Sequence, residues 1–174
     1  MTGNRPPANA ADLVVTRRGC RFRGRVFPCA VGHGGIRPDK REGDGASPAG
    51  VFPIGAVLYR PDRVAGSALP RRALPIGPRD GWCDDPQHGD YNQPVRLPHP
   101  AGHERLHRPD RLYDILLTTG HNRPDPVPGN GSAIFLHLWR RPRFPTAGCV
   151  AFRRADLLWI VARLTPRSRL VLRS

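Results

Sequence analysis

The sequence contains little lysine, little glutamate and no long apolar segment. Of its 28 basic residues 27 are arginine, Lys40 is the only lysine, and Glu42 and Glu104 are the only glutamates among 174 residues. No apolar run approaches the roughly 20 residues that span a bilayer, so no transmembrane segment is expected. The shortage of acidic residues leaves a formal net charge of +14.

This positive charge does not by itself indicate a nucleic-acid partner. The arginines are scattered from Arg5 to Arg173 in runs of no more than two. Zinc-finger spacing, a basic helix and an aromatic RNA-binding motif are all missing from the sequence. No nucleic acid is therefore expected as a partner, although a basic module that binds cell wall or nucleic acid stays open as an alternative function.

Cysteine is also scarce, with one residue each at Cys20, Cys29, Cys83 and Cys149. No two of them have C-x-x-C spacing, so neither a metal site nor a redox motif is expected, and no cofactor is implied. Whether Cys20 and Cys29 pair across a hairpin is left open by the sequence. The general expectation for a cysteine outside such a motif is a small buried apolar side chain.

The 21 prolines and 19 glycines exclude a helical bundle and favour strands joined by turns. We expect one mainly β domain, sandwich-like or barrel-like, over residues 12–174, after a flexible N-terminus at 1–11. One helix is predicted over 154–164, where an apolar stripe ends before Pro166. Residues 61–110 are predicted to be mostly irregular. The expected strands are 13–15, 20–25, 25–31, 51–60 with an interruption at Pro53, 111–119, 133–139 and 170–172.

Two motif-like segments fail on their context. His103-Glu104-Arg105-Leu106-His107 has H-E-x-x-H spacing, but nearby prolines and a glycine leave barely one helical turn, and a third zinc ligand is missing. The glycine-rich loop at 33–50 lacks the spacing of a phosphate-binding loop and the helix that must follow it. Neither a zinc protease nor a nucleotide site is expected.

A third segment, residues 132–164, carries a candidate nucleophile. His137 lies on the predicted strand 133–139, where Phe135 and His137 share one face and Leu136 and Leu138 the other. Cys149 follows twelve residues later, after the small residues of Thr146-Ala147-Gly148. A cysteine becomes a useful nucleophile when an imidazole takes its proton. The segment therefore predicts a cysteine–histidine pair if the connection folds back.

This segment resembles the catalytic motif of the L,D-transpeptidase family, the YkuD-type cysteine enzymes of peptidoglycan. The family pattern is a strand ending in I-x-x-H, followed by [ST]-x-G-C-[IV]-R; the chain has Ile134 to His137 and Thr146 to Val150, with Ala151 in place of the arginine. Residues 47–52 resemble the family's T-P-x-G-x-F turn. The stretches KREGD, GW, YN, HE, YD and GSAIFLHL resemble one proteobacterial branch.

The resemblance implies a YkuD-type fold and an acyltransferase mechanism without a metal. Cys149 is the implied nucleophile, His137 the general base, and the Leu138 carbonyl the group that orients the imidazole, at a position where many relatives have glycine or serine. The backbone N–H groups of Gly148 and Cys149 are the implied oxyanion hole. A carbapenem adduct on the cysteine is also implied. Residues expected to contact substrate are Arg37, Lys40, Arg108, Arg153 and Arg154 for carboxylates, Glu42, Asp44 and Glu104 for amines, and Trp82, Tyr91, His103 and Tyr113 as further lining.

The implied substrates are donor and acceptor stem peptides of peptidoglycan, in cell-wall biogenesis and cell shape. The branch favours a cross-link from L-Ala to diaminopimelate, of 1,3-type, over a 3,3-type link. Alternatives on the same fold are a hydrolase, an L,D-carboxypeptidase and an amidase. A periplasmic or cell-wall location is expected, although the opening MTGNRPPANAAD has no charged-then-apolar signal segment.

Overall fold

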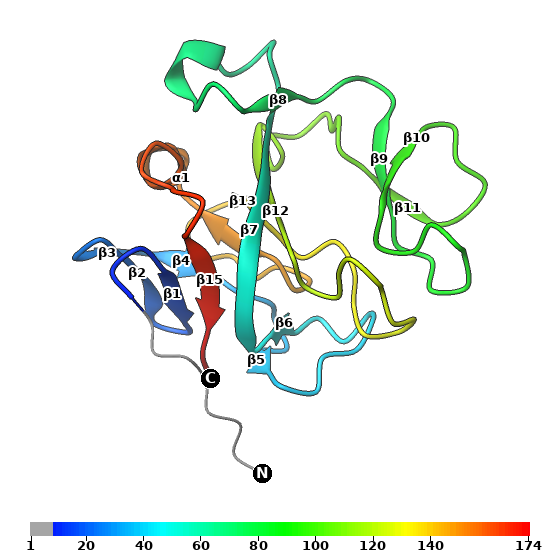
Figure 1. Cartoon of the computed structure of the whole chain (residues 1–174), viewed down its shortest axis with the longest axis horizontal. Coiled ribbons are helices and arrows are strands. Elements are labelled where there is room, and N and C mark those ends of the chain that lie inside the picture. The colour runs from blue at the N-terminus through cyan, green and yellow to red at the C-terminus, as the bar shows by residue number, and fades with distance from the viewer. Residues whose placement is uncertain (1–8) are drawn as a thin grey trace.

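A computed structural model describes residues 9–174, and its mainly β architecture confirms the predicted fold class (Figure 1). Most of the N-terminus expected to be flexible lies outside the described residues. Residues 9–12 form a turn in which the Asn9 N–H donates to the Asp12 carboxylate at 2.9 Å. Asp12 in turn binds Arg169, the first residue of the last strand.

Ten strands form one large sheet in the order β3-β2-β1-β15-β7-β12-β13-β14-β4, with β8 added beside β7. The two ends of this order, β3 and β4, are consecutive in the chain with only Pro28 between them, so the sheet is nearly closed and barrel-like. Its strands are β1 (Leu13–Thr16), β2 (Gly19–Phe22), β3 (Arg25–Phe27), β4 (Cys29–Ala30), β7 (Gly50–Tyr59), β8 (Leu74–Pro75), β12 (Ile115–Thr119), β13 (Phe135–Leu138), β14 (Val150–Phe152) and β15 (Arg169–Leu172).

The single α-helix of the described part, α1 (Arg154–Val161), follows β14 directly. Its Leu157, Ile160 and Val161 are buried in the main core together with the inward side chains of the large sheet. Burying an apolar side chain of this size contributes about 1.5–3 kcal/mol. Among residues 9–174, no helix is long and apolar enough to cross a membrane.

The prediction for the helix is wrong at its C-terminal end. The chain leaves the helix after Val161, and Leu164 then closes a turn through its N–H to the Val161 carbonyl at 3.3 Å. The N–H groups of Arg163 and Leu164 bond to carbonyls three residues back instead of four, so the α-helix has already tightened into a turn before Pro166 can act. Leu164 still packs against the main core from this turn.

The segment 61–110 is more ordered than predicted. It holds a short 3₁₀ turn at Gly66–Ala68, strand β8, and a separate three-stranded sheet in the order β10-β9-β11. These strands have two to four residues each, too few for their alternation to stand out between prolines in the sequence. The sheet consists of β9 (Asp80–Cys83), β10 (Pro94–Arg96) and β11 (His103–Arg105).

Three further strand predictions need correction. Pro53 does not interrupt β7, which runs unbroken, because Pro53 lies where the strand changes its partner from β15 to β12. The predicted strand 111–119 begins only at Ile115, after a turn closed by the Asp114 N–H to the Arg111 carbonyl at 3.2 Å. The predicted strand 25–31 is divided at Pro28 into β3 and β4.

The strand β13 has the predicted alternation of faces. Leu136 and Leu138 point into the main core, whereas Phe135 belongs to a second apolar cluster with Trp82 and Tyr113 on the opposite side. Trp82, on the middle strand β9, brings the three-stranded sheet into contact with this second cluster. His137, on the same face as Phe135, is thereby placed between the large sheet and the three-stranded sheet.

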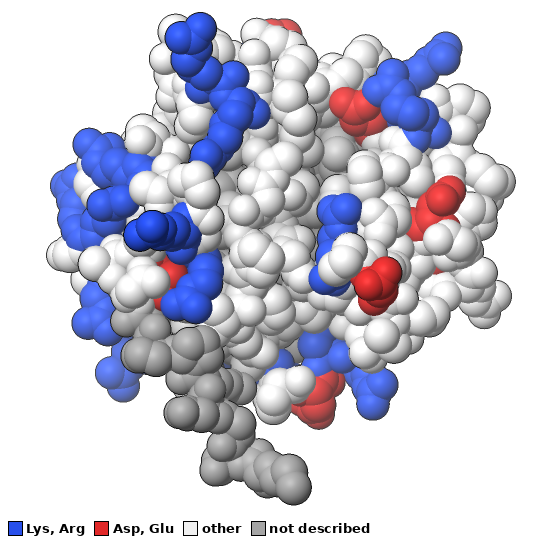
Figure 2. Space-filling model, in the orientation of Figure 1, with Lys and Arg blue, Asp and Glu red and all other residues white. Residues whose placement is uncertain are grey.

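Arginines crowd on one side of the molecule, in a segment where they are also close together in the sequence. Figure 2 shows blue side chains crowded on the side of the molecule that holds β1–β3, and fewer on the side of the three-stranded sheet. A basic surface therefore lies away from the three-stranded sheet. The exposed arginines of the β1–β3 segment are Arg17, Arg18, Arg21, Arg23 and Arg25.

Candidate active site

Two adjacent parallel strands bring His137 and Cys149 together. β13 pairs with β14 so that Leu136 lies opposite Val150 and His137 opposite Ala151. Cys149 immediately precedes β14, and its Sγ lies 3.4 Å from the backbone N of Phe135, which donates a hydrogen bond to it. His137 and Cys149 both line one cavity of about 270 Å³.

The thiol of Cys149 is sheltered and protonated at rest. Its Sγ donates to the Ala133 carbonyl at 3.2 Å. Burial raises the pKa of Cys149 to about 12, with a smaller contribution from the negative charge of Glu104. The thiolate is therefore scarce near neutral pH, and the sulfur requires a neighbouring base to act as a nucleophile.

His137 has the properties of such a base. Only 6% of the residue is exposed, and burial lowers its pKa to about 4, so the ring is neutral near pH 7. Its Nδ1 lies 2.7 Å from the Leu138 carbonyl oxygen, which can only accept. The ring proton must therefore be on Nδ1, and this leaves Nε2 with the lone pair that can take a proton.

The backbone before Cys149 is held tightly by the loop at 31–48. Ser47 Oγ donates to the Gly148 carbonyl at 2.7 Å and accepts the Gly32 N–H at 2.9 Å. Thr146 is fixed between Val31 and His33 by two backbone hydrogen bonds. The turn that resembles the family pattern thus supports the loop that carries the thiol.

Gly148 itself is required by this close approach. Its φ of +148° is rare for residues with a side chain, and a Cβ placed there would lie 2.9 Å from the Ala46 carbonyl oxygen. Its N–H, predicted to serve in an oxyanion hole, donates to Thr146 Oγ1 at 3.1 Å. Thr146 Oγ1 also donates to the Cys149 carbonyl at 2.6 Å. For the Gly148 N–H to donate to a substrate oxygen, its hydrogen bond to the Thr146 hydroxyl must first break.

Three of the residues expected to contact substrate line the cavity, namely Glu104, Arg108 and Tyr113. The Tyr113 ring meets the His137 ring edge to face, with centroids 5.3 Å apart, and its hydroxyl donates to Glu104. The Arg108 guanidinium lies over the Tyr113 ring at 5.2 Å. Burial raises the pKa of both Glu104 and Tyr113. This chain of contacts forms one wall beside the imidazole.

Other expected residues lie behind that wall. Trp82 is buried against Phe135, with ring centroids 5.0 Å apart, and its Nε1 donates to Asn92. Tyr91 donates to Glu42 at 2.5 Å. These contacts support the second apolar cluster and the neighbouring loop, and none of these five side chains lines the cavity.

The remaining expected cations make ion pairs elsewhere. Lys40 is bound to Asp44 at 2.6 Å, and Arg37 to Asp39 at 3.0 Å. The two arginines after β14 bind carboxylates next to the helix: Arg153 pairs with Asp156 and Arg154 with Asp114. His103 is on β11, with Nδ1 2.8 Å from the Ala101 carbonyl. The structure does not bring these side chains to the cavity.

Sequence reasoning missed several further residues that line the cavity. The segment between β13 and the nucleophile contributes Arg140 and Phe144, and the turn before β12 contributes Leu112. The Arg140 guanidinium lies 6.0 Å from the Phe144 ring centroid, and that of Arg141 lies 4.3 Å from it. The only signal in the sequence is the position of RRPRF between the two candidate catalytic residues.

Comparison with known families places this geometry in a class of enzyme. The model of the L,D-transpeptidase catalytic domain, YkuD, matches residues 10–172, nearly the whole chain. The chain belongs to the YkuD L,D-transpeptidase catalytic domain family. Comparison with curated proteins and with solved structures gave no significant match.

Proposed function

We propose that the protein is a peptidoglycan L,D-transpeptidase with Cys149 as its nucleophile and His137 as its general base. The observation that carries this proposal is the contact of His137 Nδ1 with the Leu138 carbonyl, which leaves Nε2 as a base in the cavity that also holds the thiol. Family membership supports the reaction class and peptidoglycan peptides as substrates. The shared cavity of Cys149 and His137 supports the use of the cysteine as the nucleophile.

In the first half-reaction, Cys149 Sγ attacks the carbonyl carbon of an amide in the donor stem, which is the L-Ala carbonyl for a 1,3-type link and the diaminopimelate carbonyl for a 3,3-type link. The thiol proton moves to His137 Nε2 as the S–C bond forms, because both groups are neutral at rest. His137 then protonates the leaving amine when the C–N bond breaks. The product is a thioester on Cys149 and a free amine.

In the second half-reaction, the amine of an acceptor stem attacks the thioester. Its nitrogen gives up a proton to His137, a new C–N bond forms, and the thiol leaves and regains its proton. The Leu138 carbonyl holds the imidazole in one tautomer through both steps, the function that a carboxylate has in other triads. Water in place of the amine gives a carboxypeptidase.

The cavity offers groups of both signs to the stem peptides. Arg140 and Arg108 are the cations on its wall, but Arg108 is bound to Asp110 at 2.8 Å. Arg140 is therefore the better candidate for a stem carboxylate, and Glu104 for an amine. We propose a 1,3-type link from L-Ala to diaminopimelate because the sequence motifs resemble those of the proteobacterial branch. We propose a periplasmic location because the substrate is peptidoglycan.

The test is incubation of the protein with purified muropeptides, followed by mass spectrometry. Cross-linked dimers whose fragmentation places the new bond on L-Ala support the full proposal, and dimers linked between two diaminopimelates correct the cross-link type. Trimmed monomers without dimers indicate the hydrolase or carboxypeptidase alternative. Activity that persists after Cys149→Ser overturns the assignment of Cys149 as the nucleophile. A protein that has no activity but still sediments with peptidoglycan indicates a binding module.

A further inference from the structure

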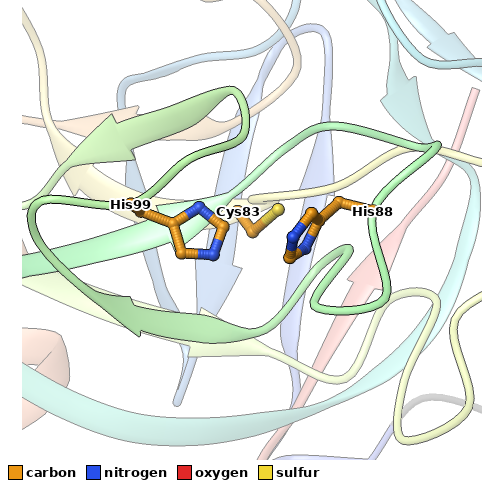
Figure 3. Close-up of side chains that lie close together, drawn as sticks. All are labelled: Cys83, His88 and His99. Carbon is orange, nitrogen blue, oxygen red and sulfur yellow. The ribbon is translucent and has the colours of Figure 1, made fainter.

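A cysteine and two histidines come together on the three-stranded sheet, apart from the active site. Cys83 ends β9, His88 lies in the loop that follows, and His99 lies in the loop after β10. One ligand atom from each lies within 4.8 Å of the other two. Figure 3 shows the Cys83 thiol between the two imidazole rings.

We propose that Cys83, His88 and His99 bind a zinc ion that ties two loops to the end of β9. Thiolate sulfur and imidazole nitrogen are the donors that Zn²⁺ prefers in structural sites. Zn–S bonds of about 2.3 Å and Zn–N bonds of about 2.0–2.1 Å place tetrahedral ligands roughly 3.3–3.6 Å apart. The cluster must contract by roughly 1 Å, which rotation of the imidazoles supplies.

The surroundings of the cluster resemble those of a metal site. Asp90 reaches both histidines: its Oδ2 lies 3.2 Å from His99 Nε2 and 3.6 Å from His88 Nδ1. A carboxylate beside a metal-binding imidazole fixes its tautomer and strengthens it as a ligand. Burial raises the pKa of the Cys83 thiol, and a backbone hydrogen bond from Asp85 only partly opposes that rise.

Local charge favours a cation in spite of the net charge of the chain. The negative charges of Asp84, Asp85 and Asp90 all raise the pKa of Cys83, because each repels a thiolate. This makes the loop after β9 an acidic region within a protein of net charge +14. A divalent ion offsets the repulsion among these carboxylates when it binds.

The site is connected to the active site through β11. Cys83 is in register with His103, and Trp82 with Glu104, whose carboxylate accepts from Tyr113 at the wall of the cavity. Zinc bound at the end of β9 therefore stabilises the sheet that presents Glu104. The proposal for zinc does not depend on the proposed transpeptidase activity.

The test uses the full chain without an affinity tag and with Cys149→Ser, which removes the thiol in the active-site cavity. After treatment with a chelator and its removal, the protein is given one equivalent of Zn²⁺, passed over a gel-filtration column and analysed for zinc. We expect about one zinc per chain and, with excess zinc, a Tm raised by roughly 5 °C or more. A cobalt-loaded sample should have the near-ultraviolet absorption of a thiolate–cobalt bond.

The decisive variant is His88→Ala, because the side chain is 35% exposed and its removal leaves the core intact. Zinc retention should fall at least tenfold in this variant and in Cys83→Ser. The matched controls, His107→Ala and Cys29→Ser, should keep about one zinc per chain. Failure of the parent to retain zinc, or equal retention by His88→Ala, overturns the proposal.

Discussion

Ser47 Oγ donates a hydrogen bond of 2.7 Å to the carbonyl oxygen of Gly148, a residue 101 positions later in the chain. The same hydroxyl accepts the N–H of Gly32 at 2.9 Å. One fully buried side chain thus joins the upstream turn, the loop at 31–33 and the residue before Cys149. The position of the thiol therefore depends on a contact outside the cavity.

Ser47→Ala should impair the enzyme through the backbone of the nucleophile loop. The substitution leaves the Gly148 carbonyl and the Gly32 N–H without their partner, which costs about 1–3 kcal/mol in the free energy of unfolding. We expect kcat to fall roughly tenfold or more with a smaller change in KM. Thermal unfolding and steady-state kinetics measure both effects. Ser67→Ala on the exposed 3₁₀ turn is the control, and the account is wrong if the two variants behave alike.

Gly148→Ala should be more severe than alanine at an unconstrained glycine. The new Cβ meets the Ala46 carbonyl at 2.9 Å in a backbone conformation that side chains avoid. A displacement of the thiol by about 1 Å costs on the order of 100-fold in rate. Gly89→Ala is the matched control, because a Cβ there has nothing within 4 Å. Equal rates for the two variants would exclude the steric argument.

Glu104→Gln should make Cys149 easier to ionise. The negative charge of Glu104 contributes to the raised pKa of Cys149, and glutamine removes that charge while it still accepts from Tyr113. The rate of alkylation of Cys149 by iodoacetamide should then rise at lower pH than in the parent protein. Mass spectrometry of the labelled peptide gives the profile. Glu42→Gln is the control, and an unchanged or alkaline-shifted profile for Glu104→Gln contradicts the account.

The low pKa of His137 predicts a loss of stability in mild acid. An unfolded histidine takes up its proton near pH 6.5, whereas the folded His137 does so only near pH 4. Because the unfolded state binds more protons in this window, the free energy of unfolding should fall as the pH falls from about 6.5 to about 4, by up to about 3 kcal/mol. Denaturant unfolding across this range measures the loss.

His137→Asn is the variant that isolates this effect, because its amide can still donate to the Leu138 carbonyl. The variant should lose less stability between pH 6.5 and pH 4 than the parent, and its turnover should fall by about 10²- to 10⁴-fold. His33→Asn at an exposed position should match the parent in both respects. A parent and a His137→Asn variant with the same pH dependence would mean that His137 titrates normally in the folded protein.

The parts of the fold that sequence reasoning found are those with local periodicity. The alternation of Phe135, Leu136, His137 and Leu138 predicted both the strand and the separation of its faces, because each face packs against a different apolar cluster. The apolar stripe predicted the helix, but it did not predict that the helix ends at Val161. The three-stranded sheet was missed because strands of three or four residues between prolines have too few alternating positions.

Only the residues of the candidate site that belong to a sequence motif were predicted from the sequence. His137 and Cys149 lie within one segment, so their spacing was visible in the sequence. Arg140 carries no pattern, and its place on the cavity wall depends on how the loop between β13 and β14 folds back. Similarly, Cys83 at the end of β9 and His99 in the loop after β10 meet only once β9 and β10 have paired.

The central claim is that Cys149 forms a covalent acyl-enzyme with His137 as its base. Intact-mass spectrometry after exposure to a carbapenem tests it most directly, because opening of the lactam by the thiol adds the whole drug to the chain. The account predicts one adduct per chain, mapped by peptide fragmentation to Cys149, absent from Cys149→Ser and formed at least tenfold more slowly by His137→Asn. An unmodified parent protein, or an adduct that persists in Cys149→Ser, would contradict it.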